Sequence, residues 1–386
     1  MLGLVCLVAL VQVSWQIKDL GVDNYKCDAT VMAKSKVNPT NADQVRFADF
    51  KVVGALGDSL TAANGAGSEP GDPLSIILQY RGLAFAAGGD FTLEKHVTIP
   101  NILRKFNPSL FGYSKGIGTE DVWDIAYVRF LNNISEGAES GDIYDQALDL
   151  VATMQRHPEK IDIQNDWKLI NVFIGANDLC TYCHNKIQDP ALSHAPAQFR
   201  DNIIKAVQVL YDNLPKTIVQ LVGMFNMRML RQIDKNNEFC QGLHLFECDC
   251  EIKKSFTDQE IGEVCNDFMA SEQQIQDNGT FTGKQDFTLV IQPFFEQILT
   301  PPMKSDGSGV DMSFFAPDCF HFSAFGHAVV AKNLWNTVLQ PVGSKQKKVD
   351  LSNYNVPINC PPKTCPFYPT VGNSKNCAAL MTDYET

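Results

Sequence analysis

Five short runs of apolar and β-branched residues, spread along the chain, constrain its fold more than any other feature. Near-continuous apolar runs of this length are typical of strands buried on both faces, as in a parallel sheet. They cover residues 51–56, 126–131, 169–174, 217–222 and 287–291. Segments with helical periodicity separate them, most clearly Ile143–Arg156, Ala197–Leu214 and Ser323–Leu339. This alternation predicts an α/β protein, a three-layer α/β/α sandwich around a five-stranded parallel sheet.

The charge of the chain limits the partners that it can bind. Its 386 residues carry a formal net charge of −12, with no block of Lys and Arg. Surfaces that bind phosphates need clustered positive charge, so we expect no nucleic-acid partner. Electrostatic docking to an anionic membrane is disfavoured for the same reason.

The first residues and the cysteines point to export. Residues 1–14 form an apolar stretch that is too short to span a bilayer and suits a signal peptide, although a buried N-terminal strand is the alternative. No later apolar run is long enough to cross a membrane, so we expect a secreted protein without a transmembrane segment. The chain holds 12 cysteines, a number typical of oxidising compartments. Loss of Cys6 with the signal would leave an odd number, and hence one free thiol.

The chain shows no internal repeat and no low-complexity linker. We therefore predict one catalytic domain over residues 25–343, followed by a cysteine-containing extension over residues 344–386. Two glycosylation sequons begin at Asn133 and Asn278 and are compatible with secretion.

A serine stands at the end of the first predicted strand, in the run Gly57–Thr61 (Gly-Asp-Ser-Leu-Thr). Open α/β folds place their ligands at this edge of the sheet, and Gly57 permits a sharp turn there. Ser59 is a candidate nucleophile, which needs a base to remove its proton. A turn serine that caps the next helix is the alternative.

The candidate base lies far downstream, just before the last predicted helix. Asp318 precedes His321 by three residues, a spacing that lets the carboxylate bind one imidazole nitrogen while the other faces the serine. His327 is a rival base, but it falls inside the helical pattern and we interpret it as a packing or hydrogen-bonding residue.

Two further residues are candidates for an oxyanion hole. Asn177 follows the central predicted strand, where a side-chain amide can donate to an oxyanion. Gly137 follows the second predicted strand and has a backbone N–H that can act as another donor. The alternative for each is ordinary turn chemistry.

These motifs, taken together and in order, resemble the SGNH (GDSL) hydrolase family, named for its Ser, Gly, Asn and His residues, and especially its phospholipase B-like branch. The resemblance runs from about residue 49 to 343. It is carried by residues 57–67, 81–90, 103–112, 175–183, 318–327, 334–336 and 340–343.

The resemblance implies a flavodoxin-like sheet, no metal or other cofactor, and ester hydrolysis through an acyl-serine. It assigns Ser59, Asp318 and His321 to the triad. The Ser59 and Gly137 backbone amides and the Asn177 side chain form the oxyanion hole. The implied substrates are phospholipids and lysophospholipids at a lipid–water interface. An esterase for other acyl or acetyl esters, or a non-catalytic lipid-binding protein, are the alternatives.

Four other features have competing interpretations. Residues 112–116 fit a nucleophile elbow around Ser114, but a loop precedes them and a predicted strand follows, so we reject it. Cys180 and Cys183 with His184 fit a haem or half-zinc pattern, yet no second metal pair completes it, and we expect disulfides. Residues 306–311 lack the ligand series of a calcium loop and predict a turn-rich loop. Phe314 and Phe315 either line an acyl groove or belong to the core.

Overall fold

The centre of the molecule is a parallel β-sheet. The computed structural model describes residues 18–69, 71–118, 137–188, 195–235, 237–248 and 256–385. Within these residues the sheet has four strands in the order β1-β2-β3-β4. They are β1 (Phe50–Gly57), β2 (Trp167–Phe173), β3 (Thr217–Val222) and β4 (Phe287–Gln292), and every pair of neighbours is parallel.

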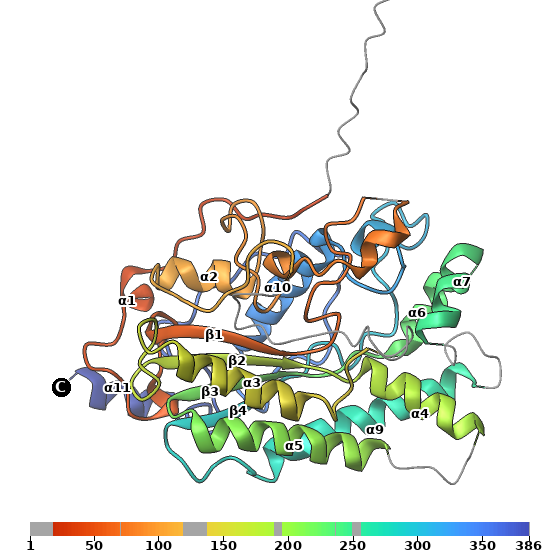
Figure 1. Ribbon diagram of the computed structural model, residues 1–386. Coiled ribbons are helices and arrows are strands. Elements are labelled where there is room, and N and C mark those ends of the chain that lie inside the picture. The colour runs from red at the N-terminus through yellow and green to blue at the C-terminus, as the bar shows by residue number, and fades with distance from the viewer. Residues whose placement is uncertain are drawn as a thin grey trace, which may run out of the picture.

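Helices cover both faces of this sheet (Figure 1). On one side lie α3 (Ile143–Arg156), α5 (Ala195–Asn213) and α9 (Asp258–Asp277). On the other lie α2 (Ile99–Phe106) and α10 (Ala324–Val338). The predicted α/β sandwich is thus present. The predicted strand at residues 126–131 lies outside the described residues, and the other four coincide with β1 to β4.

Further short helices surround the sheet. They are α1 (Ala29–Met32), α4 (Ala176–Gln188), α6 (Leu230–Asp234), α7 (Glu238–Glu247) and α11 (Cys377–Glu385), with 3₁₀ turns at 42–44, 47–49, 73–77, 81–83, 227–229 and 312–314. In Figure 1 the strands point towards the side of the molecule where α6 and α7 lie.

The local sequence explains the burial of the central strands and the places where the main helices begin. All residues of β2 and β3 are buried, as expected for central parallel strands. Thr257 and Glu260 form a capping box at the start of α9. The Ser323 side chain accepts a hydrogen bond from Gly326 N at the start of α10. Helix α3 has the predicted bounds, and α5 and α10 differ from theirs by one or two residues.

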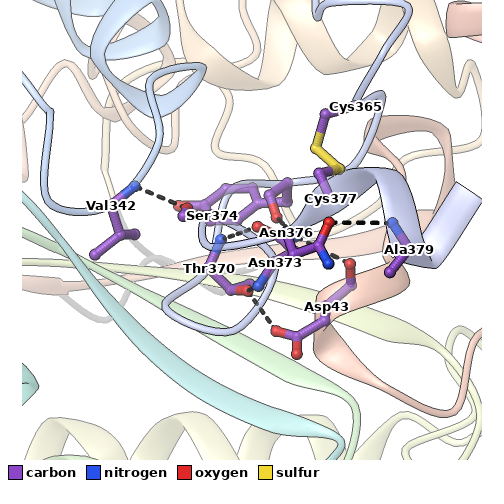
Figure 2. The surroundings of a disulfide bond; sticks show 10 residues. Asp43, Val342, Cys365, Thr370, Asn373, Ser374, Asn376, Cys377 and Ala379 are labelled. Carbon is purple, nitrogen blue, oxygen red and sulfur yellow. Dashed lines mark hydrogen bonds between the residues drawn. A yellow bond between two sulfur atoms is a disulfide. The ribbon is translucent and has the colours of Figure 1, made fainter.

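The tail after residue 343 packs into the core. Tyr368 is fully buried, contacts the rings of Phe47 and Phe50, and donates to Gln220 Oε1 of β3 at 3.1 Å. Figure 2 shows the turn that follows, where Asn373 Nδ2 donates to the backbone oxygen of Asp43 and the Thr370 hydroxyl donates to the Asp43 carboxylate. The tail is therefore held by packing and hydrogen bonds as well as by disulfides.

Four disulfides join described residues, which confirms the prediction of disulfide bonding. The pairs are Cys27–Cys360, Cys180–Cys248, Cys240–Cys319 and Cys365–Cys377. Cys183 is also disulfide-bonded, and Cys265 is a buried free thiol. Cys6 and the predicted signal peptide lie outside the described residues. Among the helices that the structure describes, none is both long and apolar enough to cross a membrane.

Candidate active site

Ser59 lies two residues beyond Gly57, the last residue of β1, and close packing holds this strand end in place. The side-chain amide of Gln146 on α3 accepts from Gly57 N and donates to Gly57 O, both at 2.8 Å. A Cβ atom at residue 57 would approach Phe173 O to 2.3 Å, so only glycine fits beside β2. The turn that carries the serine is consequently fixed to both α3 and the next strand.

His321 connects Ser59 to Asp318. The distance from His321 Nε2 to Ser59 Oγ is 2.7 Å, and that from His321 Nδ1 to Asp318 Oδ2 is 2.6 Å. With Asp318 ionised, Nδ1–H donates to the carboxylate and Nε2 is left to accept the serine proton. The structure thus brings together three side chains that are up to 262 residues apart in sequence.

The carboxylate of Asp318 is stabilised in its ionised form. The group is fully buried, which on its own would raise its pKa, but the His321 imidazole and the backbone N–H groups of Phe320 and His321 hold the pKa below its ordinary value. An ionised carboxylate at this place favours the imidazolium that forms when histidine takes a proton.

A disulfide anchors the loop that carries these two residues. Cys319 lies between Asp318 and His321 and has a φ of 69°, an uncommon conformation for a residue with a side chain. It is bonded to Cys240 of α7, and its N–H donates to Ala316 O at 3.0 Å. The covalent link ties the strained backbone of the loop to a neighbouring helix.

Asn177 and Gly137 lie against each other. Asn177 stands in the first turn of α4, directly after β2, and its Nδ2 donates to Ala138 O at 2.9 Å. A Cβ atom at residue 137 would come within 2.5 Å of that Nδ2, so a side chain at residue 137 would displace the amide. One Nδ2 hydrogen remains for another acceptor, because an amide nitrogen carries two.

The next residue of α4 holds the same loop. Asp178 accepts from both the backbone N–H and the hydroxyl of Ser140, and Thr181 donates to the Glu139 carboxylate. Burial raises the pKa of Asp178 to about 7. Burial likewise raises the pKa of Asp58, beside the candidate nucleophile, to about 6. Residues 177, 178 and 181 therefore fasten residues 138–140 to the start of α4.

The rival candidates take structural positions. His327 is fully buried, stacks on Phe85 and accepts from Phe85 N at 3.2 Å, and burial holds its pKa well below the ordinary value. Phe314 and Phe315 are buried and contact each other, which places them in the core. Ser114 is buried in a backbone bridge with Gly88, and the described residues directly after it, 115–118, are not helical.

Two segments that resemble metal-binding motifs have the structures expected of a disulfide and a turn-rich loop. Cys180 is bonded to Cys248, as expected, and residues 306–311 form a turn in which Ser308 N donates to Asp306 Oδ1 at 2.9 Å. Among the described residues no group of three or more His, Cys, Asp or Glu side chains is placed to hold a metal ion.

Comparison with known families agrees with this architecture. Residues 53–334 match the model of the GDSL-like lipase/acylhydrolase family, and this range includes most of β1, all of β2 to β4 and the Ser59, Asn177 and His321 segments. The chain belongs to this family. Its GDSL signature is the turn after β1, where the sequence is Gly-Asp-Ser-Leu over residues 57–60.

Curated members of this family give a closer relationship. The chain is 39% identical over 341 residues to the rat protein "Phospholipase B1, membrane-associated", which covers 87% of this chain and 23% of the rat protein. It is 36% identical over 358 residues to the human protein of the same name, covering 92% of this chain and 23% of the relative. The chain thus spans about a quarter of the length of these relatives.

The sequence analysis did not predict two features of this site. The first is the Cys240–Cys319 bond, which the cysteine between Asp318 and His321 could have indicated. The other is the Asp178–Ser140 pair, for which the only signal is an acidic residue directly after Asn177. Both depend on which segments meet in space, and motif order does not specify this.

Proposed function

We propose that this protein is a secreted serine esterase that hydrolyses the acyl esters of phospholipids and lysophospholipids through an acyl-serine intermediate. The observation that carries the proposal is the continuous hydrogen-bonded chain from Ser59 Oγ through His321 to Asp318. The family membership supports the ester chemistry, and the names of the relatives support the phospholipid substrate.

The first half of the reaction forms the acyl-enzyme. Ser59 Oγ attacks the ester carbonyl while its proton passes to His321 Nε2, and Asp318 stabilises the resulting imidazolium. The free Asn177 N–H and the backbone N–H groups of Ser59 and Gly137 donate to the oxyanion. When the tetrahedral intermediate collapses, His321 gives its proton to the leaving alcohol, which is the lysophospholipid or glycerophospho compound.

The second half releases the fatty acid. A water molecule in the place of the alcohol gives a proton to His321 and attacks the acyl carbon of Ser59. The same donors hold the second oxyanion, and His321 returns the proton to Ser59 Oγ as the bond to the acyl group breaks. The enzyme regains its starting state, and this cycle uses only groups of the chain and water.

The test combines covalent labelling with product analysis. Wild-type protein should react with a fluorophosphonate at Ser59, and Ser59→Ala should lose the label while keeping its thermal stability. Phosphatidylcholine labelled separately at each acyl position should release both fatty acids. If the protein is labelled but hydrolyses only short-chain or acetyl esters, it is an esterase with a different substrate class. If it is not labelled at all, a lipid-binding protein is supported instead.

Secretion is part of the same proposal. The disulfides among the described residues support an oxidising compartment, and residues 1–14 supply the proposed signal. Expression of the full chain in animal cells should place the protein in the medium, with residue 1 to about residue 14 removed. Retention inside the cell with an intact N-terminus would contradict it.

A further inference from the structure

Large apolar side chains are exposed around the segments that carry the candidate active site. Phe239 is 53% exposed and Leu245 is 51% exposed, both on α7. Ile77 and Leu78 are exposed on the segment after β1, and Leu299 and Met303 on the segment after β4. We call these six residues the apolar rim.

The rim segments adjoin the loop of Asp318 and His321. Helix α7 is joined to this loop by the Cys240–Cys319 disulfide. Gly65 lies between the loop and the first rim segment, because a Cβ atom on it would come within 3.1 Å of Ala316 Cβ and 3.2 Å of Ile76 Cα. Leu299 O accepts from Gln232 Nε2 of α6 at 2.6 Å, which connects the third segment to the helix before α7.

Helix α7 has an unusual distribution of residues between its faces. Its buried face carries Cys240 and His244, and His244 Nδ1 lies 2.9 Å from Asp234 Oδ1. The outer face carries Phe239 and Leu245, with Gly242 between them, and a Cβ placed on Gly242 would meet no atom of the described residues within 4 Å, apart from the nearby backbone of the helix itself. Cys240 and His244 anchor the helix inward, whereas Phe239 and Leu245 face outward. A helix that only covered the core would show the opposite arrangement.

We propose that the apolar rim is the surface by which this protein docks on a zwitterionic phospholipid surface, such as one of phosphatidylcholine. The proposal rests on the proposed function, since a phospholipase must take its substrate from an aggregate. Exposed apolar side chains beside a site bind lipid by inserting below the headgroups. Helix α7 has no Lys or Arg and the chain has a net charge of −12, so an anionic surface would repel it.

The docking measurement is made without catalysis. In a Ser59→Ala background, flotation with phosphatidylcholine vesicles should show binding, and the double variant Phe239→Ser/Leu245→Ser should reduce it at least tenfold. Val37→Ser is the matched control, because Val37 is 77% exposed and adjoins Asn38, which contacts Asn165 just before β2, at the opposite edge of the sheet. This control should bind as the parent does. Equal binding by the parent and the rim variant would overturn the proposal.

The activity measurement separates docking from chemistry. With Ser59 present, the rim variant should lose at least tenfold in hydrolysis of phosphatidylcholine vesicles, yet remain within twofold on a soluble short-chain ester and in fluorophosphonate labelling. An equal loss on the soluble ester would show that α7 acts on the catalytic loop and not on lipid. If wild type neither labels nor hydrolyses esters, the proposed function fails, while the flotation result still decides the docking surface.

A gain-of-signal variant guards against a folding defect. Phe239→Trp keeps an aromatic ring in the rim, and its fluorescence should shift to the blue with phosphatidylcholine vesicles. A blue shift seen only with anionic vesicles, or no shift with either kind of vesicle, would contradict docking on a zwitterionic phospholipid surface. A wild-type dimer that the double variant converts to a monomer would show that a second copy of the chain covers this face.

Discussion

Several carboxyl groups are buried close to the candidate site and are not ion-paired in the way that Asp318 is with His321. Burial raises the pKa of Asp58 to about 6 and that of Asp178 to about 7. Glu272 on α9 is also buried; Met224 N donates to its Oε2 at 3.0 Å, and burial raises its pKa well above the ordinary value. Each of these groups makes the stability of the fold depend on pH.

Glu272 gives the clearest prediction of this dependence. Its folded pKa lies above the unfolded value of 4.5, so the folded state retains a proton that the unfolded chain releases. The stability from this group is fully present below pH 4.5 and is lost as the pH rises through the folded pKa. Glu272→Gln keeps an oxygen for Met224 N but does not titrate. Denaturant titrations at pH 5, 7 and 9 should show the variant gaining on wild type as the pH rises; parallel curves would contradict it.

Asn177→Ala tests the proposed role of this side chain as an oxyanion donor. We expect kcat on a soluble ester to fall by about 10²–10³, because one donor to the transition state is lost, while the melting temperature changes little. Burst and steady-state kinetics of the purified variant measure this. A wild-type kcat would remove Asn177 from the proposed machinery.

The sequence predicts the candidate site residues well where the residues that interact lie close together along the chain or follow a predicted strand. The three-residue spacing of Asp318 and His321 already allows the bond at 2.6 Å, and the order of the motifs places Ser59 at a strand end. The burial of Asp58 and Asp178 could not be predicted in this way, since it depends on α3, α4 and the loop at 137–142 closing around them. Gly137 could be predicted only in part: its place after a predicted strand is visible in the sequence, but its contact with Asn177 is not.

At the scale of elements, the strands and long helices could be predicted from the periodicity of their apolar residues, whereas α7 could not. Its exposed Phe239 and buried His244 reverse the usual pattern of apolar residues inside and polar residues outside. The reason lies in the tertiary structure: a disulfide and the Asp234 contact hold the helix, so Phe239 and Leu245 are not needed for packing. Pairing of cysteines is likewise set by the fold and not by spacing along the chain.

The disulfide between α7 and the loop of Asp318 and His321 yields a prediction about activity. Cys240→Ser/Cys319→Ser should lower kcat at least tenfold at a temperature where the protein remains folded, because residue 319 is released from its strained conformation between Asp318 and His321. The rate of fluorophosphonate labelling should fall with it.

The matched control for this prediction is the Cys365–Cys377 bond, which joins two residues of the tail (Figure 2). Cys365→Ser/Cys377→Ser should lose stability, on the order of 2–4 kcal/mol, with kcat unchanged for the folded fraction. Equal loss of kcat in the two double variants would show that the Cys240–Cys319 bond acts only through global stability.

At the scale of the whole molecule, the tail and the first strand share one core. Tyr368 is buried against Phe47 and Phe50, and its hydroxyl also accepts from Gln292 Nε2 at 3.2 Å. Sequence composition predicted an extension tied on by cysteines. The burial of Tyr368 could not be predicted from composition, because widely spaced aromatic residues in a Pro- and Lys-containing segment give no periodic signal.

Tyr368→Ala should therefore cost about 3–5 kcal/mol of unfolding free energy, the range for removing a large buried aromatic side chain. Tyr368→Phe should cost about 1–3 kcal/mol, because the Gln220 and Gln292 side chains lose their shared partner. Both variants should keep wild-type kcat per folded molecule. Chemical denaturation with active-site titration measures both quantities, and an unchanged midpoint for Tyr368→Ala would contradict the prediction.

The bond between Cys27 and Cys360 joins positions 333 residues apart. Strands β1 to β4 are all synthesised before Cys360 and Tyr368. Until Tyr368 follows, the side of the sheet that it covers in the folded protein stays exposed. Cys27 therefore stays reduced or mispaired until Cys360, near the end of the chain, has been synthesised.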